Sequence, residues 1–431
     1  MDFKVRSADK IDDVLEIPGD KSISHRSLII SSLASGKSRI KGLLEAEDCL
    51  KTLEVMRNLG VRIKREDAGE YTIIGSGIEG LQEPDCVLDC GNSGTGMRLM
   101  SGILAGQDFY AVLSGDSSLR NRPMERIKKP LKQMGAKIWS RADGLAPISI
   151  KGEDLTGIFY EQKVASAQVK SCILLAGLFA RGATTIREPA ASRDHTERML
   201  ADAGVNISVE AKEITLTEEN HNINPLDIKV PGDISSAAFL LAAALIVPRA
   251  KIKIKNVGVN PTRSGLFKVL EKMGAKIELN NHRITSGEPA ADIEARSSSL
   301  QAVEIKGDII PKLLDEIPIL SILATQAEGR TIIRDAEELR VKETDRLAAM
   351  ADIIEKFGGR VEELQDGLII DGPVNLQGNI SIASRQDHRI AMSAAVAGLV
   401  AEGPVKIVNS ETINTSFPEF IEIMENFFGR N

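Results

Sequence analysis

The sequence predicts an α/β fold, α+β in some classification schemes, made of two domains that each repeat one unit three times. Three observations predict it: a helix pattern that ends at a glycine and recurs six times, an apolar helix pattern in phase with it, and a match between the two halves of the chain. The chain has 431 residues, which exceeds the length at which one hydrophobic core keeps growing.

The first repeated pattern is a helix-like stretch that runs into a glycine and continues as an extended segment. Glycine at this place adopts the left-handed conformation that ends a helix before the chain turns into a strand. Successive copies are 75, 69, 70, 84 and 71 residues apart, which indicates one supersecondary unit used six times. The glycines are Gly60, Gly135, Gly204, Gly274, Gly358 and, in the weakest copy, Gly429.

The second pattern is a run rich in Ala and Leu, opened by small or polar residues. Such a run is apolar nearly all round, which is typical of a core helix, and it is too short and too rich in Ala and Gly to span a bilayer. Each unit therefore predicts a buried helix, a strand, an amphipathic helix and a strand. The runs open at Asp20-Lys21-Ser22, Gly91–Gly94, Ser166–Gln168, Asp233–Ser235, Asp315-Glu316 and Asp387–Arg389.

The two halves of the chain contain closely similar segments. VPGDISSAAFLL at 230–241 echoes IPGDKSISHRSLII at 17–30, and Pro231 lies 213 residues after Pro18. The alternative is a solenoid of six units that contact only their neighbours. Because the halves match more closely than the single units do, we expect two globular domains of three units each.

The composition is that of a soluble protein that binds neither nucleic acid nor membranes. The net charge is −7, and the chain has only one Trp and three Tyr to stack on bases. The opening residues MDFKVRSADKID are charged throughout, so we expect no signal peptide and a cytoplasmic location. Cys86 and Cys90 lie four apart without a second pair of ligands, so we expect reduced thiols and no metal site.

Cations gather where the buried helices open. A helix N-terminus offers unpaired N–H groups and a partial positive charge, which suits phosphate and carboxylate. Any one of these side chains is more commonly a solvated surface charge, but their recurrence in a net acidic protein predicts a cleft for an anionic substrate. They are Lys21, Arg26, Arg98, Arg120, Arg122, Arg193, Lys342, Arg346 and Arg389.

Single motifs are less specific than the whole set. Lys21, Ser22 and Arg26 fall on one helical turn, where a phosphate could meet all three. GNSGTGMR at 91–98 lets backbone approach a ligand but matches neither a dinucleotide fingerprint nor a P-loop. Asp315-Glu316 can equally be a helix cap, and RVKETDRL at 340–347 an ion-paired helix start. His388 has at most a supporting role.

Eight segments together resemble the EPSP synthases (3-phosphoshikimate 1-carboxyvinyltransferases), and two of them, ASAQVKS and SRDHTER, resemble the bacterial class II branch. The resemblance implies the two-domain enolpyruvyl transferase fold, in which each domain has three βαβαββ-like units whose buried helices converge toward an interdomain cleft. It implies domains of 1–17 plus 230–431 and of 18–229, with the active site between them. The segments are PGDKSISHR, LDCGNSGTGMRL, NRPM, ASAQVKS, SRDHTERML, DEIPILS, LRVKETDRL and QDHRIAMS.

The family reaction transfers the enolpyruvyl group of phosphoenolpyruvate to the 5-hydroxyl of shikimate 3-phosphate through a tetrahedral intermediate. By this resemblance the catalytic residues are Asp315 as the base, Glu343 as the acid, and Lys21, which faces phosphoenolpyruvate. The residues implied for shikimate 3-phosphate are Lys21, Ser22, Arg26, Ser166, Gln168, Arg193, Asp315 and Lys342. Those implied for phosphoenolpyruvate are Lys21, Gly94, Arg122, Gln168, Arg346 and Arg389.

The resemblance also implies a monomer without metal or organic cofactor. Gly94 suggests sensitivity to glyphosate, an inhibitor that competes for the phosphoenolpyruvate site, because family members that resist it can carry Ala there. The chain departs from the family at 414–418, NTSFP, where many class I members have a Lys before T-F-P. The contact that this Lys makes with phosphoenolpyruvate is therefore absent or supplied by another residue.

Three alternatives remain on the sequence alone. UDP-N-acetylglucosamine enolpyruvyl transferases share the fold and co-substrate but carry a Cys beside the Arg-Pro that here reads Leu119–Pro123. RNA 3′-phosphate cyclases have related repeats but use a catalytic His for which no motif matches. A non-catalytic anion-binding scaffold would keep the glycines without a reason to keep Asp315, Glu343 and both cation clusters.

Overall fold

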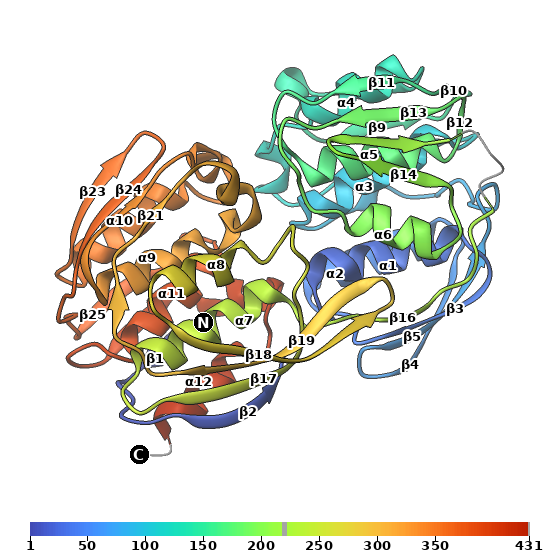
Figure 1. The fold of residues 1–431 in the computed structure, drawn as a ribbon. Helices are drawn as coiled ribbons and strands as arrows, with labels where there is room; N and C mark the ends of the chain where they lie inside the picture. The colour runs from blue at the N-terminus through green and yellow to red at the C-terminus, as the bar shows by residue number, and fades with distance from the viewer. Residues whose placement is uncertain (218–221, 430–431) are drawn as a thin grey trace. The chain divides into compact units, whose positions relative to one another are not determined.

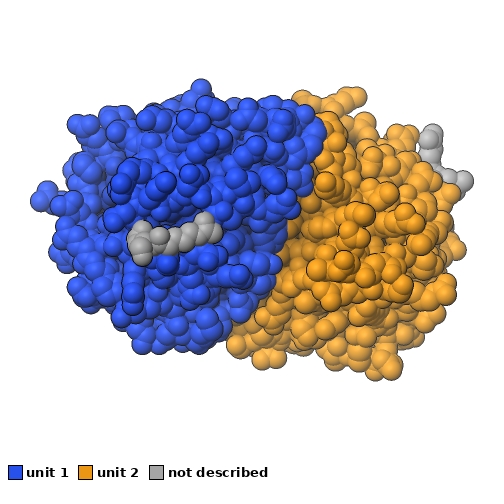
Figure 2. All heavy atoms as spheres, turned by 90° about the horizontal axis from the view of Figure 1, so that it is seen from below, with its two compact units in different colours: residues 1–18, 232–283, 289–431 blue, residues 19–231, 284–288 orange. Residues whose placement is uncertain are grey.

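In this computed structural model the chain divides into two units, each with its own hydrophobic core, over the described residues 1–217 and 222–429. Unit 1 comprises residues 1–18, 232–283 and 289–431, and unit 2 comprises 19–231 and 284–288 (Figure 2). The two crossings at 18–19 and 231–232 lie one or two residues beyond the boundaries expected from the sequence. The short segment 284–288 differs from the expectation, since the sequence assigned it to the other domain.

Contacts within unit 2 explain the place of the segment 284–288. Nδ1 of His195 lies 2.8 Å from Oε1 of Glu288, and the Arg198 side chain donates to the Gly287 carbonyl at 3.3 Å. The backbone N–H of Lys229 donates to Oγ of Ser286 at 3.0 Å. Such pairings between residues far apart in the chain leave no periodic signal in the sequence.

Buried and amphipathic helices alternate along unit 2 (Figure 1). The buried helices open with the anionic or hydroxyl caps Asp20, Ser93 and Ser166, each of which accepts a hydrogen bond from the first turn. Such caps satisfy N–H groups that a helix leaves unpaired. The buried helices are α1 (Lys21–Leu33), α3 (Gly94–Ala105) and α5 (Ala167–Gly177), and the amphipathic ones are α2 (Glu47–Asn58), α4 (Glu125–Gln133) and α6 (His195–Asp202).

The main sheets of unit 2 share one topology. An edge strand pairs in parallel with the second strand, and the remaining strands are antiparallel. The first sheet is β16 (Asp227–Lys229), β3 (Ser35–Lys41), β5 (Glu70–Ser76) and β4 (Arg62–Asp67), in spatial order. The second is β6 (Leu88–Asp89), β7 (Tyr110–Ser114), β9 (Ile148–Lys151) and β8 (Lys137–Ser140), and the third is β11 (Phe159–Glu161), β13 (Thr184–Arg187), β15 (Glu213–Leu216) and β14 (Ile207–Glu210). A short pair joins β10 (Leu155–Thr156) to β12 (Ala180–Arg181).

Unit 1 repeats this plan around the helices α7, α9 and α11, which contact one another in its core. α7 is ISSAAFLLAAALI, so it has no polar face and is buried over nearly its whole length. The buried helices are α7 (Ile234–Ile246), α9 (Ile317–Thr325) and α11 (His388–Gly398). The others are α8 (Gly265–Lys272), α10 (Arg346–Lys356) and α12 (Phe420–Gly429).

The N-terminal strands of the chain complete two sheets of unit 1. The first sheet is β18 (Lys276–Thr285), β19 (Glu288–Arg296), β17 (Lys251–Gly258) and β2 (Asp12–Glu16), with β2 parallel to β17. The second is β20 (Leu300–Gln301) and β21 (Glu304–Ile305), which both pair with β22 (Ala327–Ile333), then β24 (Gly367–Gly372) and β23 (Arg360–Leu364). The third is β1 (Phe3–Val5), β26 (Val405–Val408) and β25 (Ile380–Ala383).

The glycine pattern marks the turns from amphipathic helix to strand. Positive φ angles of 78° to 107° occur at Gly60, Gly135, Gly204, Gly274 and Gly358, as a left-handed helix end requires. The sixth copy differs, because Gly429 is the last residue of α12. Among the described helices, none combines the length and hydrophobicity needed to span a bilayer.

Candidate functional site

In unit 2, the opening turn of α1 holds the first group of candidate residues. Nζ of Lys21 lies 2.7 Å from Oδ2 of Asp48, and the Arg26 guanidinium donates to the Ser22 carbonyl at 2.8 Å. Arg26 also donates to Oγ1 of Thr196 and to Oγ of Ser171, each at 2.7 Å. Three of its five N–H groups therefore meet neutral oxygens.

Arg26 is 2% exposed, and burial lowers its pKa to about 10. Glu197 opposes this effect, whereas the nearby Arg193 adds to it. The guanidinium thus remains charged at neutral pH in a poorly hydrated place, where an anion would gain more from it than in water. Arg26 and Arg193, which the sequence placed 167 residues apart, act on one another in the folded unit.

The N-termini of α3 and α5 bring a second group together. Nη1 of Arg98 donates to the Gln168 side-chain oxygen at 2.5 Å, and the amide of Gln168 donates to Oγ1 of Thr95 at 2.8 Å. Gly94 opens α3, and a Cβ added there would lie 3.0 Å from Nη1 of Arg98 and 3.5 Å from Nη1 of Arg122. The glycine therefore leaves room between two guanidiniums.

The remaining candidates of unit 2 lie on its loops and caps. Arg122 donates to the Asn92 side chain at 2.5 Å and to Oγ of Ser118 at 3.1 Å. Ser166 caps α5, with its Oγ 3.5 Å from the backbone nitrogen of Val169. Arg26, Arg98 and Arg122 thus donate to hydroxyl, amide and carbonyl oxygens.

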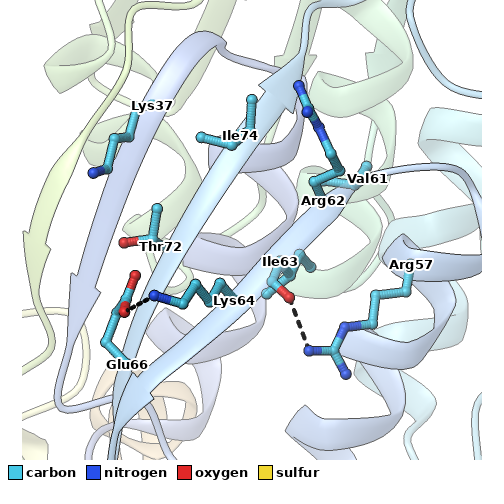
Figure 3. A pocket seen from close by; sticks show the side chains of 9 residues that line it. All are labelled: Lys37, Arg57, Val61, Arg62, Ile63, Lys64, Glu66, Thr72 and Ile74. Carbon is cyan, nitrogen blue, oxygen red and sulfur yellow. Dashed lines mark hydrogen bonds and ion pairs between the residues drawn. The ribbon is translucent and has the colours of Figure 1, made fainter.

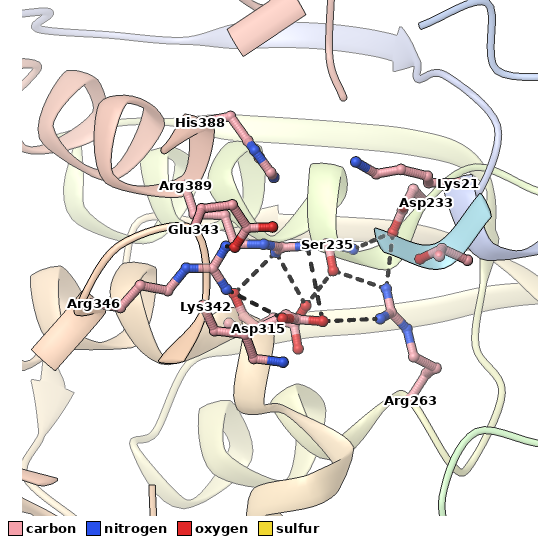
Figure 4. A network of polar contacts seen from close by, with 12 residues as sticks. Lys21, Asp233, Ser235, Arg263, Asp315, Lys342, Glu343, Arg346, His388 and Arg389 are labelled. Atoms are coloured by element: carbon pink, nitrogen blue, oxygen red, sulfur yellow. Dashed lines mark hydrogen bonds and ion pairs between the residues drawn. The ribbon is translucent and has the colours of Figure 1, made fainter. Parts of the chain in front are cut away.

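In unit 1, Arg346 lies among three carboxylates (Figure 4). Its Nε donates to Oδ2 of Asp387 at 2.8 Å, its Nη2 to Oε2 of Glu343 at 2.7 Å, and its Nη1 to Oδ1 of Asp315 at 3.3 Å. The side chain is 1% exposed. Burial alone would lower its pKa, but Asp387, Glu343 and Asp315 outweigh burial and raise it.

Two further arginines face Asp315. Nη1 of Arg389 donates to the Asp315 carbonyl at 2.9 Å, and its Nη2 lies 4.0 Å from the carboxylate. Nη1 of Arg263 lies 3.7 Å from Oδ2 of Asp315, while its Nη2 donates to Asp233 at 3.0 Å and to Ser235 at 2.8 Å. Asp315 is therefore surrounded by guanidiniums on several sides.

Lys342 and the segment 410–415 complete the description of unit 1. Nζ of Lys342 lies 3.8 Å from Oε1 of Glu338, in the short helix before α10. Asn414 and Thr415 belong to a 3-10 helix at Ser410–Thr415, and Oγ1 of Thr415 lies 3.4 Å from Nδ1 of His388. His388 thus contacts the segment where the sequence departs from the class I pattern.

Sequence reasoning missed several members of the unit 1 group. Asp233 and Asp387 cap buried helices, and their positions in the repeat could have identified them. Arg263 had no such signal, because it lies in the loop segment NPTRS between β17 and α8, outside the repeated helix openings. Its role depends on the folding of that loop onto the start of α7.

A basic groove lies on the sheet of β3, β4 and β5 in unit 2, and none of the candidate residues lines it (Figure 3). Its volume is about 560 Å³, and Lys37, Arg57, Arg62 and Lys64 are among its lining residues. Within residues 1–217 and 222–429, no three His, Cys, Asp or Glu side chains gather as a metal site would require. The four cysteines are free, and Cys49, Cys90 and Cys172 are buried.

The arrangement offers cations in both units that suit an anionic ligand, and carboxylates in unit 1 that can exchange protons. The fold agrees: the enolpyruvyl transferase NikO from Streptomyces tendae aligns with a TM-score of 0.81 at 18% identity, covering 99% of this chain and 97% of that one. Residues 5–424 match the family model described as EPSP synthase (3-phosphoshikimate 1-carboxyvinyltransferase). The chain belongs to the EPSP synthase family, which confirms the fold class and the resemblance expected from the sequence.

Individual relatives support the same assignment. The 3-phosphoshikimate 1-carboxyvinyltransferase of Thermodesulfovibrio yellowstonii is 52% identical over 410 residues, or 95% of each chain. That of Brevibacillus brevis is 50% identical over 423 residues, 98% of this chain and 99% of the relative. The structure of EPSP synthase from Acinetobacter baumannii has a TM-score of 0.88 at 44% identity, covering 99% of this chain and 98% of that one.

Proposed function

We propose that this chain transfers the enolpyruvyl group of phosphoenolpyruvate to the 5-hydroxyl of shikimate 3-phosphate, giving 5-enolpyruvylshikimate 3-phosphate and phosphate. This is a step of the shikimate pathway, which leads to chorismate and the aromatic amino acids. The observation that carries the proposal is the Asp315–Arg346–Glu343 group, in which two carboxylates share one buried guanidinium. The reaction needs both a base and an acid held in fixed places.

The binding roles follow the charges that each group offers. Arg26 and Arg193 hold the phosphate of shikimate 3-phosphate, with Ser22, Ser166 and Gln168 as polar contacts. The buried Arg26 guanidinium meets neutral oxygens, so its charge stays available for a phosphate. Phosphoenolpyruvate is held by Lys21, Gly94, Arg122, Gln168, Arg346 and Arg389.

The proton steps fall to unit 1. Asp315, with Lys342 beside it, removes the proton of the 5-hydroxyl as that oxygen attacks C2 of phosphoenolpyruvate, and Glu343 delivers a proton to the methylene carbon. In the elimination the same carbon loses a proton, the C–O bond to phosphate breaks, and the double bond re-forms. The 2.7 Å contact of Glu343 with Arg346 fixes the orientation of this carboxyl group before the reaction.

Phosphate release tests the function directly. Purified protein is given phosphoenolpyruvate with shikimate 3-phosphate, with UDP-N-acetylglucosamine, or with no acceptor. We expect release only with shikimate 3-phosphate. Release only with the UDP-sugar would indicate a UDP-N-acetylglucosamine enolpyruvyl transferase instead. No release from folded protein would indicate a non-catalytic anion-binding scaffold.

Glyphosate sensitivity is expected from Gly94. A Cβ there would lie 3.0 Å from the flexible end of Arg98, so Gly94→Ala should fold while narrowing the space between the two arginines. We expect the glyphosate inhibition constant to rise about tenfold or more, and the KM for phosphoenolpyruvate by a smaller factor. Equal changes in both constants, or a wild-type enzyme that millimolar glyphosate barely inhibits, would contradict the expectation.

The remaining expectations concern the state of the protein. We propose a cytoplasmic monomer that works without metal or organic cofactor. Sedimentation at micromolar concentration tests the oligomeric state, and activity after treatment with a chelator tests the independence of metal ions.

A further inference from the structure

A group of three buried charges lies beside the proposed shikimate 3-phosphate residues of unit 2. Nζ of Lys170, in α5, lies 2.8 Å from Oε2 of Glu188 and 2.6 Å from Oε1 of Glu197. The three side chains are 1%, 3% and 5% exposed. None of them has a role in the reaction described above.

Lys170 keeps its charge in this place. Burial opposes the ammonium, but Glu197 and Glu188 outweigh burial and raise its pKa. Burial also raises the pKa of Glu197, an effect that Lys170 opposes. The ammonium and its partners therefore depend on one another.

Stability alone does not account for such a group. Buried ion pairs lose much of their attraction to desolvation, and apolar side chains of similar size often stabilise a fold equally well. What the group provides beyond stability is a fixed geometry, so the atoms that it holds indicate its purpose.

One side of the group holds the backbone immediately before Arg193. The Ser192 N–H donates to Oε2 of Glu188 at 3.4 Å, and the Ser192 hydroxyl donates to the other oxygen of the same carboxylate. Nζ of Lys170 donates to the Ser192 carbonyl at 3.4 Å. The N–H and the carbonyl of Ser192 are thus both hydrogen-bonded. The fixed backbone at Ser192 in turn restricts the direction in which the Arg193 side chain can extend.

The other side of the group is linked to Arg26. Ser171 follows Lys170 in α5, and Thr196 precedes Glu197 in α6; their hydroxyl oxygens lie 2.7 Å apart and both accept from Arg26. A shift of Lys170 relative to Glu197 would move both acceptors. The same three charges therefore set the positions of both arginines.

We propose that Lys170 is a positioning residue for shikimate 3-phosphate, which acts with Glu188 and Glu197 to hold Arg193 and Arg26 at the spacing of one phosphate group. The inference rests on the proposed function. It predicts a selective loss of affinity for this substrate, because the residues proposed for phosphoenolpyruvate lie elsewhere, apart from Lys21 and Gln168.

Kinetics of point variants test the proposal. Lys170→Met should raise the KM for shikimate 3-phosphate about 10- to 100-fold while the KM for phosphoenolpyruvate changes by less than about threefold. Lys170→Arg keeps the charge and should restore much of the loss. Because Lys170→Met leaves two buried carboxylates without their cation, Ser192→Ala serves as a second variant that keeps all three charges and removes one contact to the loop.

Ser192→Ala should raise the KM for shikimate 3-phosphate by about threefold or more, again without a matching change for phosphoenolpyruvate. The matched control is Thr185→Ala, which removes a hydroxyl that pairs with Thr215 at 3.0 Å in the same unit and should leave both KM values unchanged.

Two results would overturn the proposal. One is a lowered melting temperature with wild-type KM values in the folded Lys170 and Ser192 variants, and the other is a parallel rise of both KM values. Failure of the proposed function is distinct, since the wild-type protein would then release no phosphate in the presence of shikimate 3-phosphate.

Discussion

Two buried arginines, Arg26 of unit 2 and Arg346 of unit 1, differ in the oxygens that they meet. In unit 2, Arg26 donates to two hydroxyls and a carbonyl, and Arg122 to an amide and a hydroxyl. In unit 1, Arg346 donates to three carboxylates. The same side chain, in the first turns of the buried helix α1 and at the start of α10, is thus placed in two different electrostatic settings.

The difference shows in the ionisation of the two buried arginines. Burial lowers the pKa of Arg26 to about 10, because Glu197 offsets that cost only in part. For Arg346 the cost of burial is outweighed, chiefly by Asp387 and Glu343, and its pKa is raised. A guanidinium among neutral groups is suited to bind an anion, whereas one among carboxylates can, besides binding an anion, orient groups that exchange protons. The two units share one repeated fold, and the groups that surround each arginine determine what that arginine can do.

The largest expected effect is on the proton steps of unit 1. Asp315→Asn keeps the size of the side chain but removes the base, so kcat should fall about 1000-fold, far more than the KM for shikimate 3-phosphate, which Asp315 also contacts, should rise. Steady-state kinetics on folded protein measure this. Asp308→Asn, in the preceding 3-10 helix of the same unit, is the control and should behave as wild type. A fall in kcat of less than about tenfold would remove Asp315 from the role of base.

The same substitution in both units tests the comparison itself. Arg346→Lys leaves one ammonium among three carboxylates that a guanidinium fork had oriented, so kcat should fall about 100-fold, and the KM for phosphoenolpyruvate, which Arg346 also binds, should rise by a smaller factor. Arg26→Lys should instead raise the KM for shikimate 3-phosphate about 10- to 100-fold, with a smaller effect on kcat. Arg39→Lys, exposed on β3, is the control. If the two variants changed kcat and KM by similar factors, the proposed difference between Arg26 and Arg346 would be wrong.

Local patterns of the sequence predicted much of this arrangement. Helix caps and left-handed glycines act within a few residues of themselves, so Asp20, Gly60 and Gly358 could be recognised without any tertiary information. The buried helices followed from their apolar composition. The resemblance to a family then supplied the candidate roles.

Partners brought together by tertiary packing could not be predicted in this way. Lys170 is a polar residue in an apolar helix, and nothing near it in the chain indicates that Glu188 and Glu197 neutralise it. Arg263 comes from an irregular loop whose path depends on Asn260, which accepts from the backbone N–H of Arg263 at 2.8 Å. Ion-pair partners far apart in the chain leave no spacing to recognise.

Arg263 gives a smaller, positional effect. It bridges Asp233 and Ser235 and lies 3.7 Å from Asp315. Arg263→Gln should therefore leave the Asp315 carboxylate present but less firmly oriented. We expect kcat to fall about tenfold, with Arg263→Lys intermediate and both KM values near wild type. If Arg263 acts through Asp315, the pH profile of kcat should also change in this variant. Unchanged kcat and pH profile in folded Arg263→Gln would assign the residue to stability alone.

The smallest effect concerns the acid stability of unit 2, where His25 is buried against neutral hydroxyls. Its Nδ1 lies 2.8 Å from Oγ1 of Thr52, and burial, opposed by Asp48, lowers its pKa to about 3. The unfolded chain therefore binds a proton below about pH 6.5 that the folded unit does not take up until far lower pH. Stability should fall as the solution is acidified, by about 2 kcal/mol between pH 6.5 and 5, before most carboxylates titrate.

The single tryptophan, Trp139, lies in β8 of unit 2, so its fluorescence during urea unfolding reports on this unit. His25→Asn should flatten the dependence of the unfolding free energy on pH in that range, whereas His282→Asn, at an exposed position in unit 1, should leave it as in wild type. An unaltered slope in His25→Asn would mean that another group carries the acid sensitivity. A flattened slope would show that the neutral surroundings that suit unit 2 to bind anions also make it sensitive to acid.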